Sequence, residues 1–381
     1  MADKRRKKRR ARSKPPIFLV VLLIIAIVFA YVLYAYGFFD KWLQKDDGHG
    51  GQDGVIVTDD LQIHFLELGN KHSGDCTLIK VGDTEVLVDA GSKSSSASTI
   101  AAYLDNYVTD GKIEYVIATH AHEDHISALV GSNTVPGIFD RYEFGTIIDF
   151  AKTDQKLKTN AGNDTLYKKY LDKREALETG GTVHYTALDC YNNANGAKRS
   201  YELAPDITLN FLYQKFYEEK ADTENNYSVC FLLSQGVNHY LFTGDLEKEG
   251  ETSLAESNRL PKCKLFKAGH HGSETASNAV LIDVIQPELV CVCCCGGYRE
   301  YKQTEQAKEF PSQAFCDNVT KYTDKIYVTT IYSETAEGNF ASMNGNIVVS
   351  SNGGEVTVRC SASNLPFTES EWYKTYRKKA A

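Results

Sequence analysis

The segment "ATHAHEDHIS", residues 118–127, holds three histidines and two acids within ten positions. It overlaps the end of the apolar run "EYVIA", so it lies where a strand is expected to finish. Alternate residues of a strand share a face, and His120 and His122 are therefore placed to bind one metal ion. Asp124 and His125 follow at once and are expected to reach a second ion. Imidazole and carboxylate ligands together favour zinc, with manganese and iron as alternatives.

Three further motifs supply what a two-metal site still lacks. "VLVDAG" places Asp89 at the end of an apolar strand, either as a turn acid or as a carboxylate that orients a ligating histidine. "LFTGDLE" places Asp245 at another strand end, where its carboxylate is suited to bridge two ions. "FKAGHHGS" contains His270 and His271, whose side chains diverge because they are neighbours. One of the two is expected to ligate, while the other faces the substrate or packs.

The motifs T-H-x-H-x-D-H, T-G-D and H-H-G-S, in this order, resemble the metallo-β-lactamase fold. Within that superfamily the chain is similar to the ComEC-type competence domain, on the further strength of "HFLELGNKHSGDCTLIK" and "ENNYSVCFLL". The resemblance covers residues 61–360 and implies an α/β fold, an αββα sandwich with a dinuclear metal site at one sheet edge. The metal ligands that it implies are His120, His122, Asp124, His125, Asp245 and one of His270 and His271, here assigned to His271.

The chain departs from this family pattern in two places. Many members have a ligating histidine between the first cluster and the bridging aspartate, but His184 and His239 lack the G-H-x-x-G context. As in ComEC-type sequences, Asn225 or Asn226 stands nearby instead. The G-H-P-S motif of ComEC-type domains is replaced here by "EFPS", with Phe310 at the histidine position. These departures leave the metal site in place and put nuclease-type substrate contacts in question.

The resemblance implies hydrolysis by a hydroxide that bridges two divalent ions, zinc in the first place and manganese as the alternative. The residues expected to act in catalysis are Asp124, Asp245, His270 and His271, with Asp89 behind them as an orienting carboxylate. The expected substrate contacts are Asn226, Ser228, Lys267 and Ser273, although Asn226 and Ser228 also suit a structural place in a strand.

We expect a phosphodiesterase, with DNA or a phosphodiester of the cell envelope as the substrate. The alternatives are an ester or amide hydrolase from the lactamase side of the superfamily, and a non-catalytic surface module. A site built for two ions argues against the last of these. H-H-G-S without the intermediate histidine favours phosphodiesters over esters and amides.

The order of elements along the chain is β-rich, α, β-rich, α. Strands are expected at 61–68, 76–81, 84–91 and 113–120, with Gly82-Asp83 as a hairpin turn. A second strand set is expected at 207–214, 228–234, 238–245 and the cysteine run "ELVCVCCCGG". Helical spacing marks 95–108, 164–181, 246–257 and 277–286. This order predicts two sheets packed face to face with helices outside.

The N-terminus predicts a membrane anchor. Residues 1–14 carry nine Lys/Arg and one acid, a net charge of +8, and Ile17–Phe39 has no charged residue. This apolar stretch is long enough to cross a bilayer and longer than the apolar core of a signal peptide, which is the alternative. Positive charge stays on the cytoplasmic side, so the domain is expected to face outward. Because the whole chain carries −8, the residues after the arm carry −16, which disfavours bulk attraction of polyanions.

We therefore expect a single-pass protein of the cell membrane with an extracytoplasmic catalytic domain. The expected parts are a basic cytoplasmic arm (1–16), a transmembrane helix (17–39), a linker (40–60), the hydrolase domain (61–362) and a C-terminal tail (363–381). The membrane and a phosphodiester substrate, with nucleic acid as one candidate, are the expected partners, and no obligate protein partner is inferred. The ten cysteines match no zinc-finger spacing and are expected to be buried free thiols.

Overall fold

The structure is a computed structural model, and it describes residues 60–300 and 305–377. The predicted arm, transmembrane helix and nearly all of the linker lie outside the described residues. Within the described ranges, no helix combines the length and the apolar character needed to span a bilayer. All described residues belong to one compact unit, Gly54–Ala381.

The first sheet has eight strands in the order β16-β15-β1-β2-β3-β4-β5-β6. β3 to β6 pair in parallel, and the other neighbours are antiparallel, so the sheet is mixed. The Gly82-Asp83 turn joins β2 and β3, as predicted. The strands are β1 (Leu61–Phe65), β2 (Thr77–Val81), β3 (Thr84–Val88), β4 (Lys112–Ile117), β5 (Glu143–Asp149), β6 (Val183–Thr186), β15 (Ile347–Ser351) and β16 (Val356–Cys360).

The second sheet also has eight strands, in the order β14-β13-β12-β11-β10-β9-β8-β7. Its parallel part runs from β10 to β13, flanked by antiparallel strands. The strands are β7 (Ser200–Ala204), β8 (Ile207–Phe211), β9 (Phe231–Gln235), β10 (Asn238–Phe242), β11 (Leu265–Lys267), β12 (Val290–Gly296), β13 (Ile326–Tyr332) and β14 (Phe340–Ser342).

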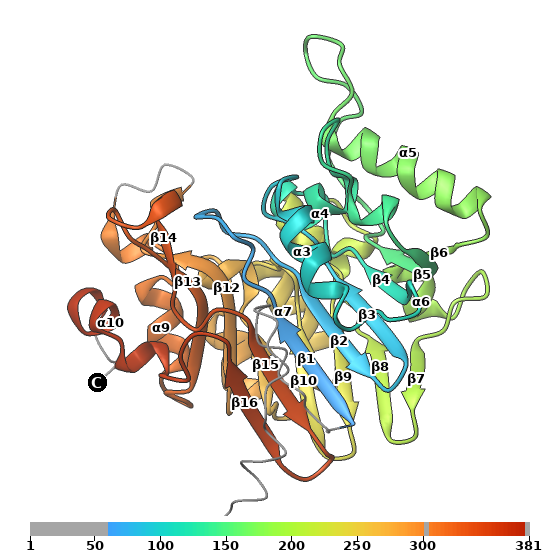
Figure 1. Ribbon diagram of the computed structural model, residues 1–381. Coiled ribbons are helices and arrows are strands. Elements are labelled where there is room, and N and C mark those ends of the chain that lie inside the picture. Colours follow the sequence, from blue (N-terminus) through green and yellow to red (C-terminus); the bar gives the residue numbers. More distant parts are fainter. Residues whose placement is uncertain (1–59, 301–304, 378–381) are drawn as a thin grey trace, which may run out of the picture. The chain divides into compact units, whose positions relative to one another are not determined.

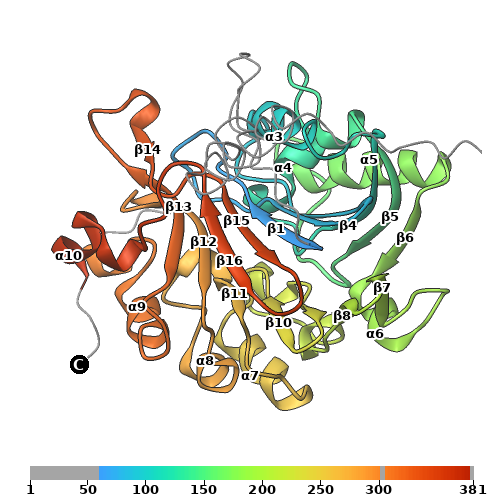
Figure 2. The same cartoon turned by 60° about the horizontal axis from the view of Figure 1, so that its bottom comes forward.

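Helices cover the outer face of each sheet (Figures 1 and 2). On the first sheet lie α3 (Ser96–Leu104), α4 (Glu123–Val130) and α5 (Leu166–Thr179), and on the second lie α7 (Lys248–Ser257), α8 (Ala279–Ile285) and α9 (Gln313–Val319). The remaining helices are α6 (Ala187–Asn192), α10 (Glu371–Tyr376) and the short 3-10 helices η1 (Ile138–Asp140), η2 (Lys215–Tyr217), η3 (Glu224–Tyr227), η4 (Gly269–Gly272), η6 (Gln306–Lys308), η7 (Glu337–Asn339) and η8 (Phe367–Glu369). These layers confirm the α/β fold with two mixed sheets.

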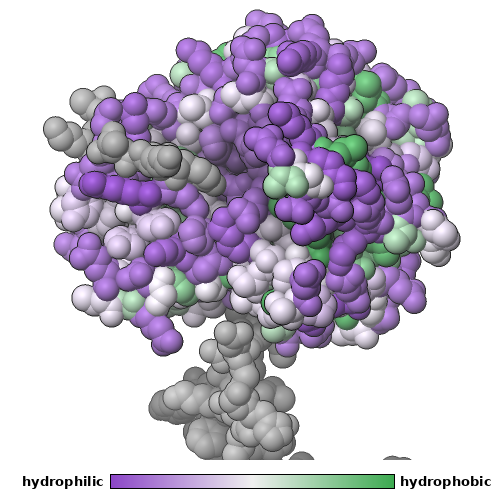
Figure 3. Space-filling model, turned by 90° about the horizontal axis from the view of Figure 1, so that it is seen from above, coloured by the Kyte–Doolittle hydropathy of each residue, from purple (hydrophilic) through white to green (hydrophobic). Residues whose placement is uncertain are grey.

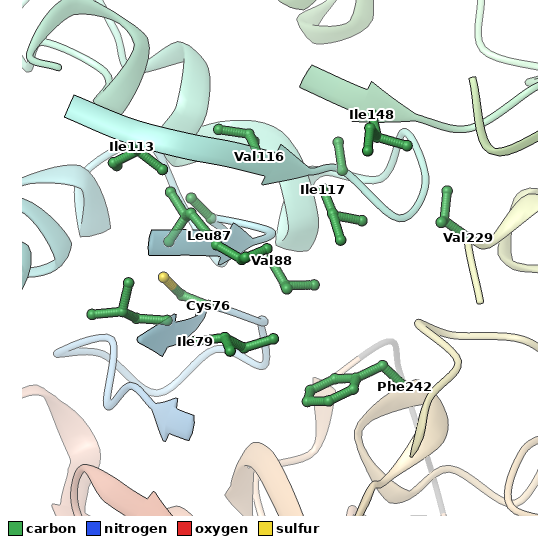
Figure 4. Close-up of a cluster of buried hydrophobic side chains, with 14 of the residues drawn as sticks. Cys76, Ile79, Leu87, Val88, Ile113, Val116, Ile117, Ile148, Val229 and Phe242 are labelled. Atoms are coloured by element: carbon green, nitrogen blue, oxygen red, sulfur yellow. The ribbon is translucent and has the colours of Figure 1, made fainter. Parts of the chain in front are cut away.

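The main core fills the space between the two sheets. Inward-facing side chains of both sheets meet there because alternate strand residues share a face. Phe242 of β10 stacks on Phe231, with ring centroids 4.7 Å apart, and faces Phe65 of β1 across the layer at 6.3 Å. Figure 4 shows part of this cluster, in which Phe242 lies opposite Ile79 and Val88 of the first sheet. Removing a buried ring of this kind typically costs about 3–5 kcal/mol.

Hydrophilic side chains predominate on the face seen in Figure 3. The cysteines agree with the prediction of buried free thiols: all ten are free, and only Cys360 is partly exposed. The segment expected as a C-terminal tail packs against the domain where it is described. Phe367 of η8 and Tyr373 of α10 are buried in the core between the second sheet and its helices. Burial of these apolar rings is favourable. The two helices of this segment are too short to show a clear helical pattern in the sequence.

Candidate metal centre

Four strands, two from each sheet, end at one edge of the sandwich and deliver the predicted site residues. Asp89 follows β3 and His120 follows β4 in the first sheet, while Asp245 follows β10 and η4 follows β11 in the second. Val229 N bonds Thr119 O across the sheets at 2.9 Å, which ties the two edges together. The ligand motifs therefore meet although more than a hundred residues separate them.

The loop after β3 and the first turn of α4 are locked together by their backbones. Ala90 N donates to His125 O at 2.8 Å, and Asp75 N donates to Asp124 O at 3.0 Å. A Cβ on Gly91 would lie 1.8 Å from Asp124 O, so only glycine permits this approach. This contact fixes Asp124 and His125 at the start of the helix.

Asp124, His125, Asp245 and His271 bring their donor atoms within 4.8 Å of one another. Asp245 Oδ2 lies 3.1 Å from His125 Nε2 and 3.4 Å from His271 Nε2. Asp124 Oδ2 lies 3.4 Å from His271 Nε2. Two carboxylates and two imidazoles at these separations form a suitable ligand set for a divalent ion.

A second pair of donors adjoins this group. His120 Nε2 and His122 Nδ1 are 3.0 Å apart, and the rings of His120 and His125 have centroids 4.1 Å apart. Ring nitrogens that share one tetrahedral zinc at about 2.0–2.1 Å lie roughly 3.3 Å from each other. The pair therefore has close to the spacing that one shared ion requires, as the H-x-H motif predicted.

Unsatisfied buried atoms test whether these residues fit a metal. His125 Nε2, His271 Nε2 and Asp245 Oδ1 are buried in the described structure without a well-formed hydrogen bond. Each such atom costs about 1–3 kcal/mol unless something satisfies it. All three atoms belong to the same cluster, so bound divalent cations would satisfy all of them. The donor set fits the two ions that the fold typically binds.

The other nitrogen of each central histidine is held by a fixed acceptor. His125 Nδ1 donates to Asp89 Oδ2 at 2.8 Å, and Asp89 also accepts from Thr119 N at 2.7 Å. His271 Nδ1 donates to the carbonyl of Cys293 at 2.9 Å. These bonds leave each Nε2 to face the cluster. Asp89 has a left-handed backbone, φ 57°, and its carboxylate stands behind His125.

His270 and His271 both have left-handed backbones, with φ of 44° and 54°, and their side chains lie in different places. His271 is fully buried in the cluster, whereas His270 turns into the adjoining cleft. His270 Nδ1 lies 2.9 Å from Thr275 Oγ1, and its Nε2 is 4.0 Å from Asp245 Oδ2. The pair that the sequence left ambiguous is thereby separated into one candidate ligand and one cleft residue.

Lys267, expected to contact substrate, lies inside the protein instead. It ends β11 with its side chain toward the interior, where Nζ lies 2.6 Å from Asp75 Oδ2. Asp75 Oδ1 is 3.3 Å from His271 Nδ1, so the pair sits directly behind the cluster. Burial opposes the charge on Lys267, but the Asp75 carboxylate outweighs this and raises the pKa of Lys267. Sequence reasoning missed Asp75, although the Gly74-Asp75 turn was its signal.

Asn226 and Ser228 are buried rather than exposed to substrate. Asn226 Oδ1 accepts from Glu247 N at 3.0 Å, and Ser228 Oγ accepts from Asp245 N at 3.0 Å. Both therefore hold the loop that carries Asp245, which corrects their expected role. Of the adjacent residues Asn225 and Asn226, Asn225 is the one that lines the cleft.

The cleft beside the cluster has a volume of about 530 Å³. Hydroxyl, amide and charged side chains line most of it, including Ser273 at the place predicted. The remaining lining residues are Ser73, Ser92, Lys93, His122, Glu123, Asp124, Asn225, His270, Glu274, Thr275, Glu300, Lys308 and Phe310. The arrangement offers hydrogen bonds to an oxyanion next to the metal ligands.

Charge in the cluster favours a cation. Burial lowers the pKa of His120 well below its ordinary value, and the neighbouring His125 cation adds to this. For His271, burial is outweighed by the carboxylates of Asp245 and Asp75, which raise its pKa to about 10. The same balance, with Asp245 and Asp89, raises the pKa of His125 well above its usual range. The buried carboxylates thus stabilise the protonated forms of His125 and His271, and a divalent ion would supply the same compensating positive charge.

The model of the metallo-beta-lactamase superfamily matches residues 69–131, the segment that carries the first histidine cluster. Together with the two mixed sheets and the candidate metal site, this match establishes the metallo-β-lactamase fold that the motifs predicted.

The chain is similar to two curated competence-type proteins. It is 27% identical to Recombination protein 2 of Haemophilus influenzae over 108 residues, 28% of this chain and 12% of that protein. It is 33% identical to ComE operon protein 3 of Bacillus subtilis over 70 residues, 18% of this chain and 9% of that protein. The chain thus matches only a small part of each relative's length.

Among solved structures, the metallo-beta-lactamase fold protein YhfI from Bacillus subtilis aligns with 78% of this chain and 100% of its own. The identity is 12% and the TM-score is 0.40.

Proposed function

We propose that this protein is a metal-dependent phosphodiesterase held at the membrane by its N-terminal apolar segment. The observation that carries the proposal is the convergence of the buried, unsatisfied atoms of His125, His271 and Asp245 beside a polar cleft. Bound divalent ions would supply Lewis-acid activation of water and of a phosphoryl oxygen. His120, His122, Asp124, His125, Asp245 and His271 would hold them.

The cleft residues are suited to bind and orient the phosphoryl group. His270 lies 3.5 Å from Asn225 Nδ2, so an imidazole and an amide stand side by side next to Asp245. Burial lowers the pKa of His270, and the His271 cation adds to this. At neutral pH its ring is then neutral and has one donor and one acceptor nitrogen. Thr275 fixes the ring, which leaves His270 placed to hydrogen-bond a phosphoryl oxygen or the leaving oxygen.

DNA is one candidate substrate because both relatives are named for recombination or for the ComE operon. The cleft does not favour a polyanion. Lys93 Nζ is 2.7 Å from Glu123 Oε2, and Lys308 Nζ is 3.4 Å from Glu274 Oε1. A nucleic-acid track needs cations that are not already neutralised. With −16 on the residues after the arm, the cleft supports a less charged phosphodiester, such as one of the cell envelope.

An ester or amide hydrolase is the second candidate, and a substrate panel separates the two. The full chain in detergent, loaded with zinc or manganese, is assayed on bis-p-nitrophenyl phosphate, single-stranded DNA, nitrocefin and a lactone. We expect turnover of the phosphodiester and at least a 10³-fold loss in Asp245→Asn. Turnover of nitrocefin or the lactone alone would overturn the proposal. DNA cleavage at a comparable rate would make the protein a DNase.

A further inference from the structure

Beside the catalytic cleft lies a second hollow of about 630 Å³, and four of its nine described lining residues are aromatic. Tyr298 and Tyr332 form one wall, with ring centroids 5.4 Å apart. Trp372 and Tyr376 of α10 contribute a second aromatic pair, with centroids 5.3 Å apart. Residues of the expected C-terminal tail therefore build one side of this hollow.

The Trp372 ring is held in place by its neighbours. The Arg377 guanidinium stacks on Trp372, 4.5 Å from its centroid, and itself donates to the carbonyls of Pro311 and Glu309. A Cβ on Gly297 would come within 2.5 Å of Trp372 Nε1, so glycine makes room for the indole. Aromatic surfaces that are fixed in this way bind ligands at a low entropic cost.

Neighbouring residues of one stretch of chain line the hollow and the catalytic cleft. Tyr298 and Arg299 line the hollow, while the next residue, Glu300, lines the cleft. Glu309 lines the hollow, while the next residue, Phe310, lines the cleft. Glu300 Oε2 accepts from Ser73 N at 2.7 Å, which fastens this shared wall to the first-sheet side of the metal centre. The hollow and the cleft therefore adjoin each other along this stretch of chain.

The charges around the rings select the kind of group that fits. Arg299 Nε lies 2.6 Å from Glu309 Oε1, so this cation is already paired, and Glu334 adds a further carboxylate. Single-stranded nucleic acid needs aromatic rings together with a positive groove for its phosphates, whereas the described lining residues of the hollow include one arginine and two glutamates. A neutral sugar ring fits both the aromatic rings and the carboxylates of this lining. Its C–H face packs on aromatic rings, and its hydroxyls donate to carboxylates.

We propose that the hollow is a subsite for a sugar ring esterified to the scissile phosphate. This rests on the proposed phosphodiesterase function and specifies its substrate as a glycosyl phosphodiester.

Direct binding tests the subsite without any need for hydrolysis. The chain has two tryptophans, so the Trp42→Phe variant of the full chain leaves Trp372 as its single tryptophan fluorophore. We expect titration with maltotriose or N,N′,N″-triacetylchitotriose to change its fluorescence with saturation, and a ten-residue oligothymidylate to leave it unchanged. A response to the oligothymidylate alone, or to none of these probes, would overturn the proposal.

Kinetics then separates the subsite from the chemistry. The substrates are methyl p-nitrophenyl phosphate and the methyl glucoside 6-(p-nitrophenyl phosphate), which share one leaving group. We expect Tyr332→Ala to lower kcat/KM on the glucoside by up to about tenfold, and Trp372→Phe to lower it less. Neither variant should change kcat/KM on the methyl phosphodiester. Equal losses on both substrates would overturn the subsite. Failure of the wild type on both substrates would instead refute the phosphodiesterase, while sugar binding to Trp372 would still be measurable.

Discussion

Lys267 Nζ lies 2.6 Å from Asp75 Oδ2 in the interior, directly behind His271 of the metal cluster. Both side chains are almost fully buried. Removing one partner of such a pair leaves an uncompensated buried charge and typically costs about 3–5 kcal/mol.

We therefore expect Lys267→Met to lower the free energy of unfolding by several kcal/mol, as measured by urea denaturation of the full chain in detergent. The double variant Lys267→Met, Asp75→Asn removes both charges and is expected to recover part of that loss. If the single variant is as stable as wild type, the pair is not charged in the folded protein.

The division of roles between His270 and His271 predicts different effects on metal content. Asparagine tolerates a left-handed backbone, so His270→Asn and His271→Asn form a matched pair at adjacent positions. Elemental analysis after dialysis is expected to show a loss of metal in His271→Asn only. His270→Asn should retain the metal and lose about 10²–10⁴-fold in kcat if it acts on the phosphoryl or leaving oxygen. Equal metal loss in both variants would contradict this division.

Asp89 predicts a measurable contribution to metal affinity through His125. Asp89→Asn suits the left-handed backbone and keeps an acceptor near His125 Nδ1, but removes the charge. Loss of such an orienting carboxylate typically lowers metal affinity about 10–100-fold. Competition with a chromogenic chelator measures this, and circular dichroism checks that the variant is folded. An unchanged affinity would show that Asp89 serves only the turn.

We expect that position 91 does not tolerate even one added methyl group. A Cβ there would lie 1.8 Å from Asp124 O, so Gly91→Ala must displace the first turn of α4 and with it His125. We expect a loss of several kcal/mol in stability together with weaker metal binding. Gly354→Ala is the matched control, because its new Cβ would lie 3.6 Å from its nearest neighbour. Similar thermal stabilities for the two variants would contradict the close approach of Gly91 to α4.

Buried His64 predicts a pH dependence of stability away from the metal centre. Burial, with the nearby Lys80 cation, lowers the pKa of His64 to about 3 in the folded state, against an ordinary value of 6.5. Below pH 6.5 the unfolded chain binds a proton that the folded chain refuses. Stability from this group is therefore full above about pH 6.5 and falls by about 1.4 kcal/mol per pH unit toward pH 3.

Urea denaturation at pH 7 and pH 5 tests this. The wild type is expected to lose about 2 kcal/mol more than His64→Gln over that interval. The glutamine side chain in this variant would still accept the hydrogen bond from the Tyr103 hydroxyl that His64 Nδ1 accepts at 2.8 Å. Identical pH dependences of the two proteins would show that folding does not lower the pKa of His64.

The sequence by itself was sufficient to predict the fold class and to mark the candidate metal ligands. His120, His122 and Asp124 stand in one short motif at a strand end, and local strand periodicity places such residues at a sheet edge. The T-G-D and H-H-G-S motifs follow the same logic at the ends of β10 and β11. Ligand chemistry depends on residue type and local spacing, so the candidate ligands could be predicted from the sequence.

Tertiary structure decided which neighbours of these motifs face inward. Lys267 and Ser228 are polar and near the site in sequence, yet both are buried, where Lys267 contacts Asp75 and Ser228 accepts from the backbone of Asp245. His270 and His271 lie in a left-handed turn that no periodicity encodes, and the fold buries only His271 fully. The aromatic hollow joins Tyr298 to Trp372, which are distant in sequence. Such pairings are properties of chain packing, and only the folded arrangement determines them.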